Sequence, residues 1–171
     1  MLRDDVMSSR QLAGRVRRYH TWPVLHRQTV GEHSARVATL YVELFGLPRA
    51  EVLYHVLHHD SGELTAGDPP FPVKKLHPLY KEGHAAAEAD GLRSLGVELP
   101  DLASFEQHRV KVCDLLEMHE FGAAELTMGN KYAEPIVRDT WDAVQKYADT
   151  SLNHEDSMKV GTWMRDNGVK T

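Results

Sequence analysis

Two histidines and two aspartates in the middle of the chain have the residue types of a metal site: His33, the adjacent pair His59 and Asp60, and Asp114. Each falls on or beside the apolar side of a predicted helix, where side chains are normally nonpolar. A buried carboxylate without a partner costs free energy, because burial removes its water. Imidazoles and carboxylates both bind borderline or hard divalent ions, so one ion could compensate all four side chains.

Helical spacing directs these side chains inward. His33 stands four residues before Val37, and Asp114 stands four residues after Val110, so each shares a face with an apolar residue. His59 and Asp60 extend the apolar face of the preceding segment in the same way. We therefore expect the four side chains to point toward a common interior.

Glu63 could add an acid or base to such a site. It lies four residues after His59 and three after Asp60, so all three share a face if the helix continues. Its carboxylate could accept a proton from attacking water, orient that water, or hold a second ion such as Mg²⁺ or Co²⁺.

The chemistry expected of the ligand set is hydrolysis of a phosphate ester. Two histidines and two aspartates leave coordination positions open for water, and a divalent ion lowers the pKa of such water and polarises a phosphoryl oxygen. Zn²⁺, Mn²⁺, Co²⁺ and Fe²⁺ all accept mixed nitrogen and oxygen ligands, so the sequence leaves the metal open.

The elements that must position these residues are helices. Apolar residues recur at helical spacing and strand alternation is nearly absent, which predicts an all-α fold. Pro48 suits a helix first turn, and three prolines between 69 and 72 predict a stiff loop that could wall a pocket. Helices are expected at about 8–17, 30–45, 48–58, 59–66, 78–95, 105–126, 131–149 and 154–165.

Composition limits the class of protein. A chain of 171 residues is expected to form a single domain over 1–171, with a core at roughly 15–150 and a C-terminal helix at 154–165. The net charge of −5 argues against a nucleic-acid polymer as partner. Cys113 alone cannot form an intrachain disulfide, and no long apolar run predicts a membrane span or a secretory signal. We expect a cytoplasmic protein, in the host cytoplasm if it is phage-encoded.

The ordered set of histidines and aspartates resembles the HD-domain phosphohydrolase superfamily, which is named after the adjacent His-Asp pair. The segments 28–34 (QTVGEHS), 59–68 (HDSGELTAGD) and 72–74 (PVK) look like those of small bacterial 5′-deoxynucleotidases. They look equally like those of small phage deoxynucleoside triphosphohydrolases, including enzymes that act on dATP. The resemblance covers roughly residues 15 to 120 and implies a helical bundle with a metal site between helices.

The resemblance also implies roles for individual residues. Arg18 would contact phosphate, and the ring of Tyr19 would pack on the sugar and leave no space for a 2′-hydroxyl. The family often has Trp at the position of Tyr19, so Trp22 is the alternative. The implied metal ligands are His33, His59, Asp60 and Asp114; the implied catalytic residues are Glu63, Arg18 and Lys74; the implied substrate contacts are Arg18, Tyr19, Trp22, Phe71, Pro72 and Lys74.

The predicted function is hydrolysis at the 5′ phosphate of 2′-deoxynucleotides. A dATP or dNTP triphosphohydrolase is favoured, because the segments around Arg18 and His33 look closest to the small phage enzymes. A 5′-deoxynucleotidase acting on dNMP would use the same metal ligands. A catalytically silent nucleotide-sensing module is a further alternative, and a signalling phosphodiesterase would usually have more ligands and a longer chain. Relatives are commonly dimers or hexamers, so a homo-oligomer is expected.

Overall fold

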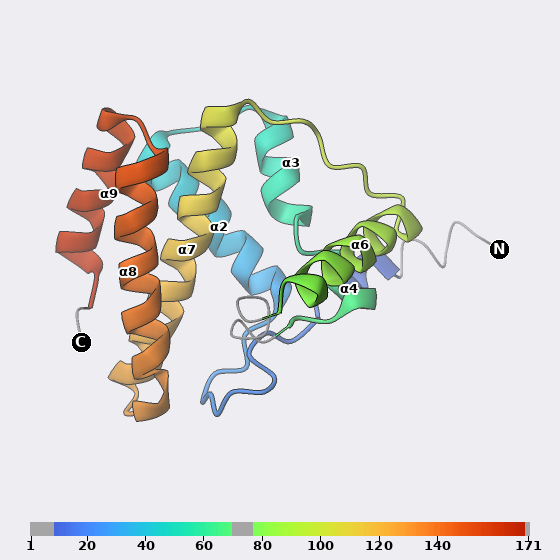
Figure 1. Ribbon diagram of the computed structural model, residues 1–171, viewed down its shortest axis with the longest axis horizontal. Helices are drawn as coiled ribbons and strands as arrows, with labels where there is room; N and C mark the ends of the chain where they lie inside the picture. Colours follow the sequence, from blue (N-terminus) through green and yellow to red (C-terminus); the bar gives the residue numbers. More distant parts are fainter. Residues whose placement is uncertain (1–8, 70–76, 170–171) are drawn as a thin grey trace.

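Helices make up nearly all of the regular structure in the computed structural model, which describes residues 9–69 and 77–169 (Figure 1). This confirms the all-α prediction. Among the described residues, no helix has both the length and the apolar character needed to cross a bilayer. Residues 9–13 are helical, and they are followed by α2 (Val30–Phe45), α3 (Ala50–His58), α4 (Glu63–Ala66), α6 (Pro78–Ser94), α7 (Ser104–Thr127), the 3₁₀ helix η1 (Lys131–Ala133), α8 (Glu134–Ser151) and α9 (His154–Asn167).

Five helices enclose the main core. α8 packs against both α7 and α9, and α2 contacts α3, α7 and α9 (Figure 1). Their apolar faces meet in one cluster, in which Val37, Leu40, Val52 and Leu116 are fully buried. α4 and α6 pair beside this bundle around a second, smaller apolar cluster. The predicted ligands therefore lie on, or directly after, helices that border the main core.

The chain before α2 is tied to the start of that helix. The predicted helix 8–17 is too long: within the described residues the helix ends at 13, the chain turns, and Arg17 pairs with Thr29 in an antiparallel bridge. The amide of Gly31 donates to the carbonyl of Gly14 at 3.0 Å, and the amide of Arg18 donates to the carbonyl of Gln28. These backbone contacts take the place of the last turn of the predicted helix, and they bring Arg18 alongside α2.

The local sequence explains where two of the helices begin. Thr29 caps α2 in a reciprocal capping box with Glu32, and Pro78 occupies the first turn of α6. The predicted start of α3 at 48 is wrong by two residues, because Arg49 is extended and forms the N-cap, which leaves Pro48 before the helix.

The predicted helix 59–66 is also corrected. α3 ends at His58, and the next four residues form a tight turn before the short α4. The amide of Ser61 donates to the carbonyl of His58, and the amide of Glu63 donates to the carbonyl of Asp60, each at 3.0 Å. These three-residue steps wind the backbone more tightly than an α-helix. His59 and Asp60 therefore lie in a turn rather than on a helix face.

A glycine contact holds this turn against α6. A Cβ on Gly62 would lie 2.3 Å from the carbonyl oxygen of Glu88, and a Cβ on Gly91 would lie 2.6 Å from the carbonyl oxygen of Gly62. Both distances are shorter than any side chain tolerates, so the two backbones can meet only at glycines. The position of α6 thus fixes the position of the turn that carries His59 and Asp60.

Substitution at this contact should destabilise the protein. Gly91→Ala forces a methyl group onto the backbone of Gly62, and we expect the free energy of unfolding to fall by about 1–3 kcal/mol. Gly83→Ala is the matched control, because this glycine of α6 has open space around its Cβ position, and it should raise the free energy of unfolding by up to about 1 kcal/mol. Urea unfolding of the two variants measures both effects, and equal effects would refute the contact.

Candidate metal and phosphate site

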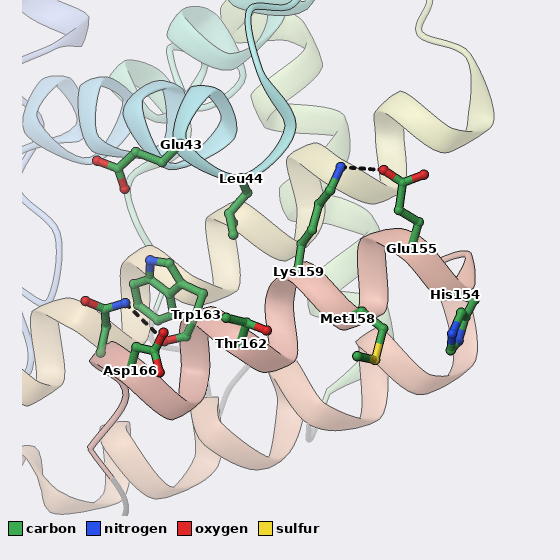
Figure 2. A pocket seen from close by; sticks show the side chains of 10 residues that line it. Glu43, Leu44, His154, Glu155, Met158, Lys159, Thr162, Trp163 and Asp166 are labelled. Carbon is green, nitrogen blue, oxygen red and sulfur yellow. Dashed lines mark hydrogen bonds and ion pairs between the residues drawn. The ribbon is translucent and has the colours of Figure 1, made fainter.

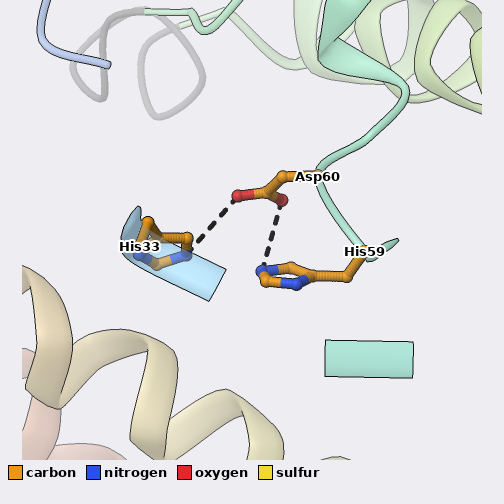
Figure 3. A group of neighbouring side chains, drawn as sticks. All are labelled: His33, His59 and Asp60. Atoms are coloured by element: carbon orange, nitrogen blue, oxygen red, sulfur yellow. Dashed lines mark ion pairs between the residues drawn. The ribbon is translucent and has the colours of Figure 1, made fainter. Parts of the chain in front are cut away.

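Three of the predicted ligands converge between α2 and the turn after α3 (Figure 3). Ligand atoms of His33, His59 and Asp60 all lie within 4.8 Å of one another. Asp60 stands between the two imidazoles: Oδ2 is 3.5 Å from Nε2 of His33, and Oδ1 is 3.4 Å from Nε2 of His59. The compact turn, rather than a shared helix face, brings these three side chains together.

Asp114 joins the group from α7. Its Oδ1 lies 3.3 Å from Nε2 of His33, and its Oδ2 accepts a hydrogen bond of 2.5 Å from Lys111. The single nitrogen Nε2 of His33 therefore approaches two carboxylates. Within the described residues this fully buried atom makes no well-aligned hydrogen bond, so a bound ion could take the place of its missing partner.

Both histidines are held with Nε2 facing the cluster. Nδ1 of His59 lies 2.7 Å from the carbonyl oxygen of Val56, and Nδ1 of His33 lies 2.6 Å from Oε2 of Glu117. A carbonyl oxygen and a carboxylate only accept, so Nδ1 carries a proton in each ring. Hydrogen bonds at the far nitrogen are the usual way in which a protein orients metal-ligating histidines.

Glu63 lies in the same environment with its charge poorly compensated. Burial raises the pKa of Glu63 to about 9, and the negative charges of Asp60 and Asp68 add to the effect. Its Oε2 is buried without a hydrogen-bond partner among the described residues. A bound cation is the group that would offset so many carboxylates, and the imidazole and carboxylate donors fit a divalent ion.

Arg18 lies close to this acidic cluster. Its guanidinium is buried, and Nη1 donates to Oε2 of Glu117 at 3.1 Å and to Oε1 of Gln28 at 3.2 Å. The negative charges of Asp60 and Asp114 also act on Arg18 and favour its charged form. The structure therefore brings the predicted phosphate-binding arginine to the predicted metal ligands.

Tyr19 follows Arg18 in a left-handed backbone conformation, with φ of 55°. Its amide donates to Oδ2 of Asp68 at 2.9 Å, and its ring stacks on Phe121 with centroids 4.4 Å apart. Its hydroxyl is buried and has no hydrogen-bond partner among the described residues. A non-glycine residue at positive φ costs energy, and here the stacking and the bond to Asp68 hold it.

Among the other predicted substrate contacts, the structure describes Trp22. Its indole donates to the carbonyl oxygen of Tyr132 in η1. Phe71, Pro72 and Lys74 lie outside the described residues. Of the predicted substrate contacts in the described part of the chain, Arg18 and Tyr19 thus lie at the site.

Three polar residues near the site were missed by sequence reasoning. Glu117 receives hydrogen bonds from both His33 and Arg18, Gln28 bonds to both Arg18 and Glu117, and Asp68 holds the backbone of Tyr19. Glu117 follows Asp114 by three residues, a helical spacing that was available as a signal. No spacing rule links Gln28 to α7, because that contact depends on how the segment before α2 folds back.

A buried carboxylate on α7 also holds the segment between Tyr19 and α2. Glu125 is fully buried and accepts hydrogen bonds from the backbone amides of Leu25 and His26, each at 2.7 Å. Asn130 donates to the same carboxylate and to the carbonyl of Pro23. This segment, which borders the site, is thus anchored through its backbone.

A separate groove of about 660 Å³ lies between α9 and the C-terminal end of α2 (Figure 2). Glu43 and Leu44 line it from α2, and Trp163 and the ion pair of Lys159 with Glu155 line it from α9. The predicted ligands lie elsewhere, so the candidate site is the polar cluster and not this groove.

Comparison with known proteins finds a relative in sequence and a solved structure of similar fold. Models of known protein families give no match to the sequence. A 5′-deoxynucleotidase of Pasteurella multocida (strain Pm70) is 29% identical over a match 143 residues long, and the match covers 68% of this chain and 73% of the relative. The HD phosphohydrolase DatZ of cyanophage S-2L, solved with dA and one catalytic Zn²⁺ ion, superposes with a TM-score of 0.76 at 22% identity, over 93% of this chain and 94% of DatZ.

The chain is thus similar to a 5′-deoxynucleotidase in sequence and to an HD phosphohydrolase in fold. The adjacent histidine and aspartate of the HD motif are His59 and Asp60, which lie in the cluster with His33. The HD fold predicted from the sequence is confirmed over most of the chain. The candidate ligands of metal and substrate in this chain are assigned from the geometry above.

Removing one carboxylate should weaken metal binding. In Asp60→Asn the carboxylate between the two imidazoles becomes a neutral amide, and we expect the affinity for Zn²⁺ to fall by more than about tenfold. Competition with a chromophoric chelator measures this affinity. Asp101→Asn changes an exposed aspartate and should leave the affinity unchanged; equal affinities of the two variants would exclude Asp60 as a ligand.

Proposed function

We propose that this protein is a metal-dependent phosphohydrolase that acts at the 5′ phosphate of 2′-deoxynucleotides, and that it is a dATP or dNTP triphosphohydrolase. The observation that carries the proposal is the convergence of His33, His59, Asp60 and Asp114 beside a buried arginine. The fold shared with DatZ, which was solved with dA and Zn²⁺, supports a deoxynucleoside site. The relation to a 5′-deoxynucleotidase supports the same class of substrate.

A divalent ion held by His33, His59, Asp60 and Asp114 would supply the Lewis-acid chemistry that activates water and polarises the phosphoryl group. Arg18 supplies a fixed positive charge for phosphate oxygens, and its anchoring to Glu117 and Gln28 means that little reorganisation is needed when charge develops. The uncompensated Oε2 of Glu63 holds or moves the proton of the attacking water.

Tyr19 gives the site a wall on the nucleoside side. Its ring is fixed on Phe121 and its backbone is held by Asp68, so it cannot easily move to admit a larger sugar. A rigid aromatic face beside the phosphate-binding Arg18 supports contact with a deoxyribose that lacks the 2′-hydroxyl. The resemblance to the family implies the same role for Tyr19.

A 5′-deoxynucleotidase is the second candidate, and the relation to the enzyme of Pasteurella multocida favours it. The two candidates share the ligands and differ in which phosphorus atom is attacked. A triphosphohydrolase cleaves next to the sugar of a dNTP and releases intact triphosphate, whereas a nucleotidase releases phosphate from a dNMP. The products therefore distinguish the candidates.

Product analysis is the test of the proposal. The protein is loaded with Zn²⁺, Mn²⁺ or Co²⁺ and incubated separately with dATP and dAMP, and the products are separated by chromatography. We expect deoxyadenosine and triphosphate from dATP. Phosphate from dAMP, with dATP untouched, would support the nucleotidase instead, and no turnover of any nucleotide with any of the three metals would leave the silent nucleotide-sensing module.

Glu63→Gln should lower kcat by roughly 10²–10⁴-fold if Glu63 handles the proton. Glu82→Gln on α6 is the control, because Glu82 is exposed, and it should retain full turnover. Full turnover of Glu63→Gln would contradict this role while leaving the substrate assignment intact.

Tyr19→Ala should reduce discrimination against ribonucleotides. Loss of the ring opens space for a 2′-hydroxyl, so the ratio of kcat/KM for dATP to that for ATP should fall by about tenfold or more. Tyr132→Ala removes an exposed ring and keeps the backbone carbonyl that binds Trp22, so its ratio should equal that of the unaltered protein. An unchanged ratio in Tyr19→Ala would exclude Tyr19 as the sugar wall.

A further inference from the structure

One carboxylate oxygen contacts both a candidate metal ligand, His33, and the candidate phosphate ligand, Arg18. Oε2 of Glu117 lies 2.6 Å from Nδ1 of His33 and 3.1 Å from Nη1 of Arg18, and its other oxygen accepts from the amide of Gln28. Gln28 in turn accepts from Arg18, which closes the network. All four side chains are buried, with exposed fractions of 0% for His33, 2% for Glu117, 6% for Gln28 and 9% for Arg18.

We propose that Glu117 is a positioning residue that orders the metal ligand His33 and the phosphate-binding Arg18 together, so that metal affinity and phosphate affinity depend on the same side chain. The proposal rests on the proposed function, because it takes His33 as a ligand of the ion and Arg18 as a ligand of phosphate. It assigns Glu117 no contact with the ion or with the substrate.

The effect on His33 follows from the donor and acceptor roles. The carboxylate of Glu117 can only accept, so it fixes a proton on Nδ1 and keeps Nε2 facing Asp60 and Asp114, where its lone pair would bind the ion. Without this acceptor the ring could place its proton on Nε2 or turn about its side-chain bonds. Each of these changes removes a ligand from the ion.

The effect on Arg18 follows from charge and burial. A buried guanidinium needs a negative partner, and Glu117 provides one at 3.1 Å. The bond uses Nη1, and the neutral amide oxygen of Gln28 accepts from the same nitrogen. The remaining N–H groups of Arg18 keep their direction because this corner of the guanidinium is fixed.

The position of Glu117 on α7 explains how it reaches the ring of His33 beside Asp114. Glu117 follows Asp114 by three residues, so the two carboxylates share a face of α7 about one turn apart. Asp114 approaches Nε2 of His33 and Glu117 approaches Nδ1, so the imidazole lies between them. A single turn of α7 therefore contacts both edges of the same ring.

Glu117→Gln tests the proposal, because the amide keeps the shape and loses the charge. We expect the affinity for Zn²⁺, measured by chelator competition, to fall about 10–100-fold. At saturating Zn²⁺ we expect the affinity for inorganic phosphate, measured by calorimetry, to fall by about tenfold. Glu120→Gln, one turn further along α7 in a partly exposed ion pair with Arg36, is the control and should change neither.

Loss of only one of the two affinities in Glu117→Gln would overturn the shared role, and loss of neither would overturn the proposal altogether. Nitrogen-15 NMR of the unaltered Zn²⁺-loaded protein gives a second readout that does not depend on the folding of a variant. His33 should ligate through Nε2 and carry a slowly exchanging proton on Nδ1, in contrast to the exposed His154. Ligation through Nδ1, or rapid exchange of this proton, would overturn the proposal.

These readouts are independent of hydrolysis. If the unaltered protein hydrolyses no deoxynucleotide while both affinities fall in Glu117→Gln, the proposed function fails and the positioning role stands. If it hydrolyses deoxynucleotides and Glu117→Gln binds Zn²⁺ and phosphate normally, the positioning role fails alone. Absence of Zn²⁺ binding in the unaltered protein overturns both.

Discussion

Compensation of buried negative charge is the constraint on which this structure depends. Asp60, Glu63, Asp114 and Glu117 come from three separate elements and meet where α2, α7 and the turn after α3 come together. Burial by itself would raise the pKa of Asp114, yet Lys111 and the histidines hold it well below its usual range. Glu63 has no comparable partner, and its pKa rises. The protein therefore compensates part of this charge itself, and a divalent ion would compensate the rest.

Periodicity predicted most of the helices because the main core is made by long amphipathic helices. α2 begins at Val30 and ends at Phe45, the predicted bounds, since a capping box marks its start and Gly46 its end. The candidate ligands His33, His59, Asp60 and Asp114 were predicted because they are polar residues on the apolar faces of predicted helices. Sequence reasoning failed where tertiary contacts override local preference. Residues 14–17 leave the helix for a bridge with Thr29, and residues 59–62 tighten into a turn against α6.

The same distinction separates the parts of the site that could be predicted from those that could not. His59, Asp60 and Glu63 are neighbours in sequence, so they lie close together even though residues 59–62 form a turn and not the predicted helix. Glu117 reaches Arg18 across 99 residues, and Gln28 reaches Glu117 across 89. Such contacts depend on the relative placement of α2, α7 and the segment before α2, which no local pattern encodes. Candidate metal ligands are visible in the sequence as polar residues on apolar faces, whereas residues placed to orient them look like ordinary polar side chains.

The anchoring of residues 22–28 by Glu125 bears on how such a site could diversify. The carboxylate binds the amides of Leu25 and His26, while the side chains of these two residues are exposed. Amides are common to every residue type except proline, so the segment keeps its path when its side chains change. Evolution can therefore vary the chemistry of the rim beside Tyr19 and leave the ion site and the helical core as they are.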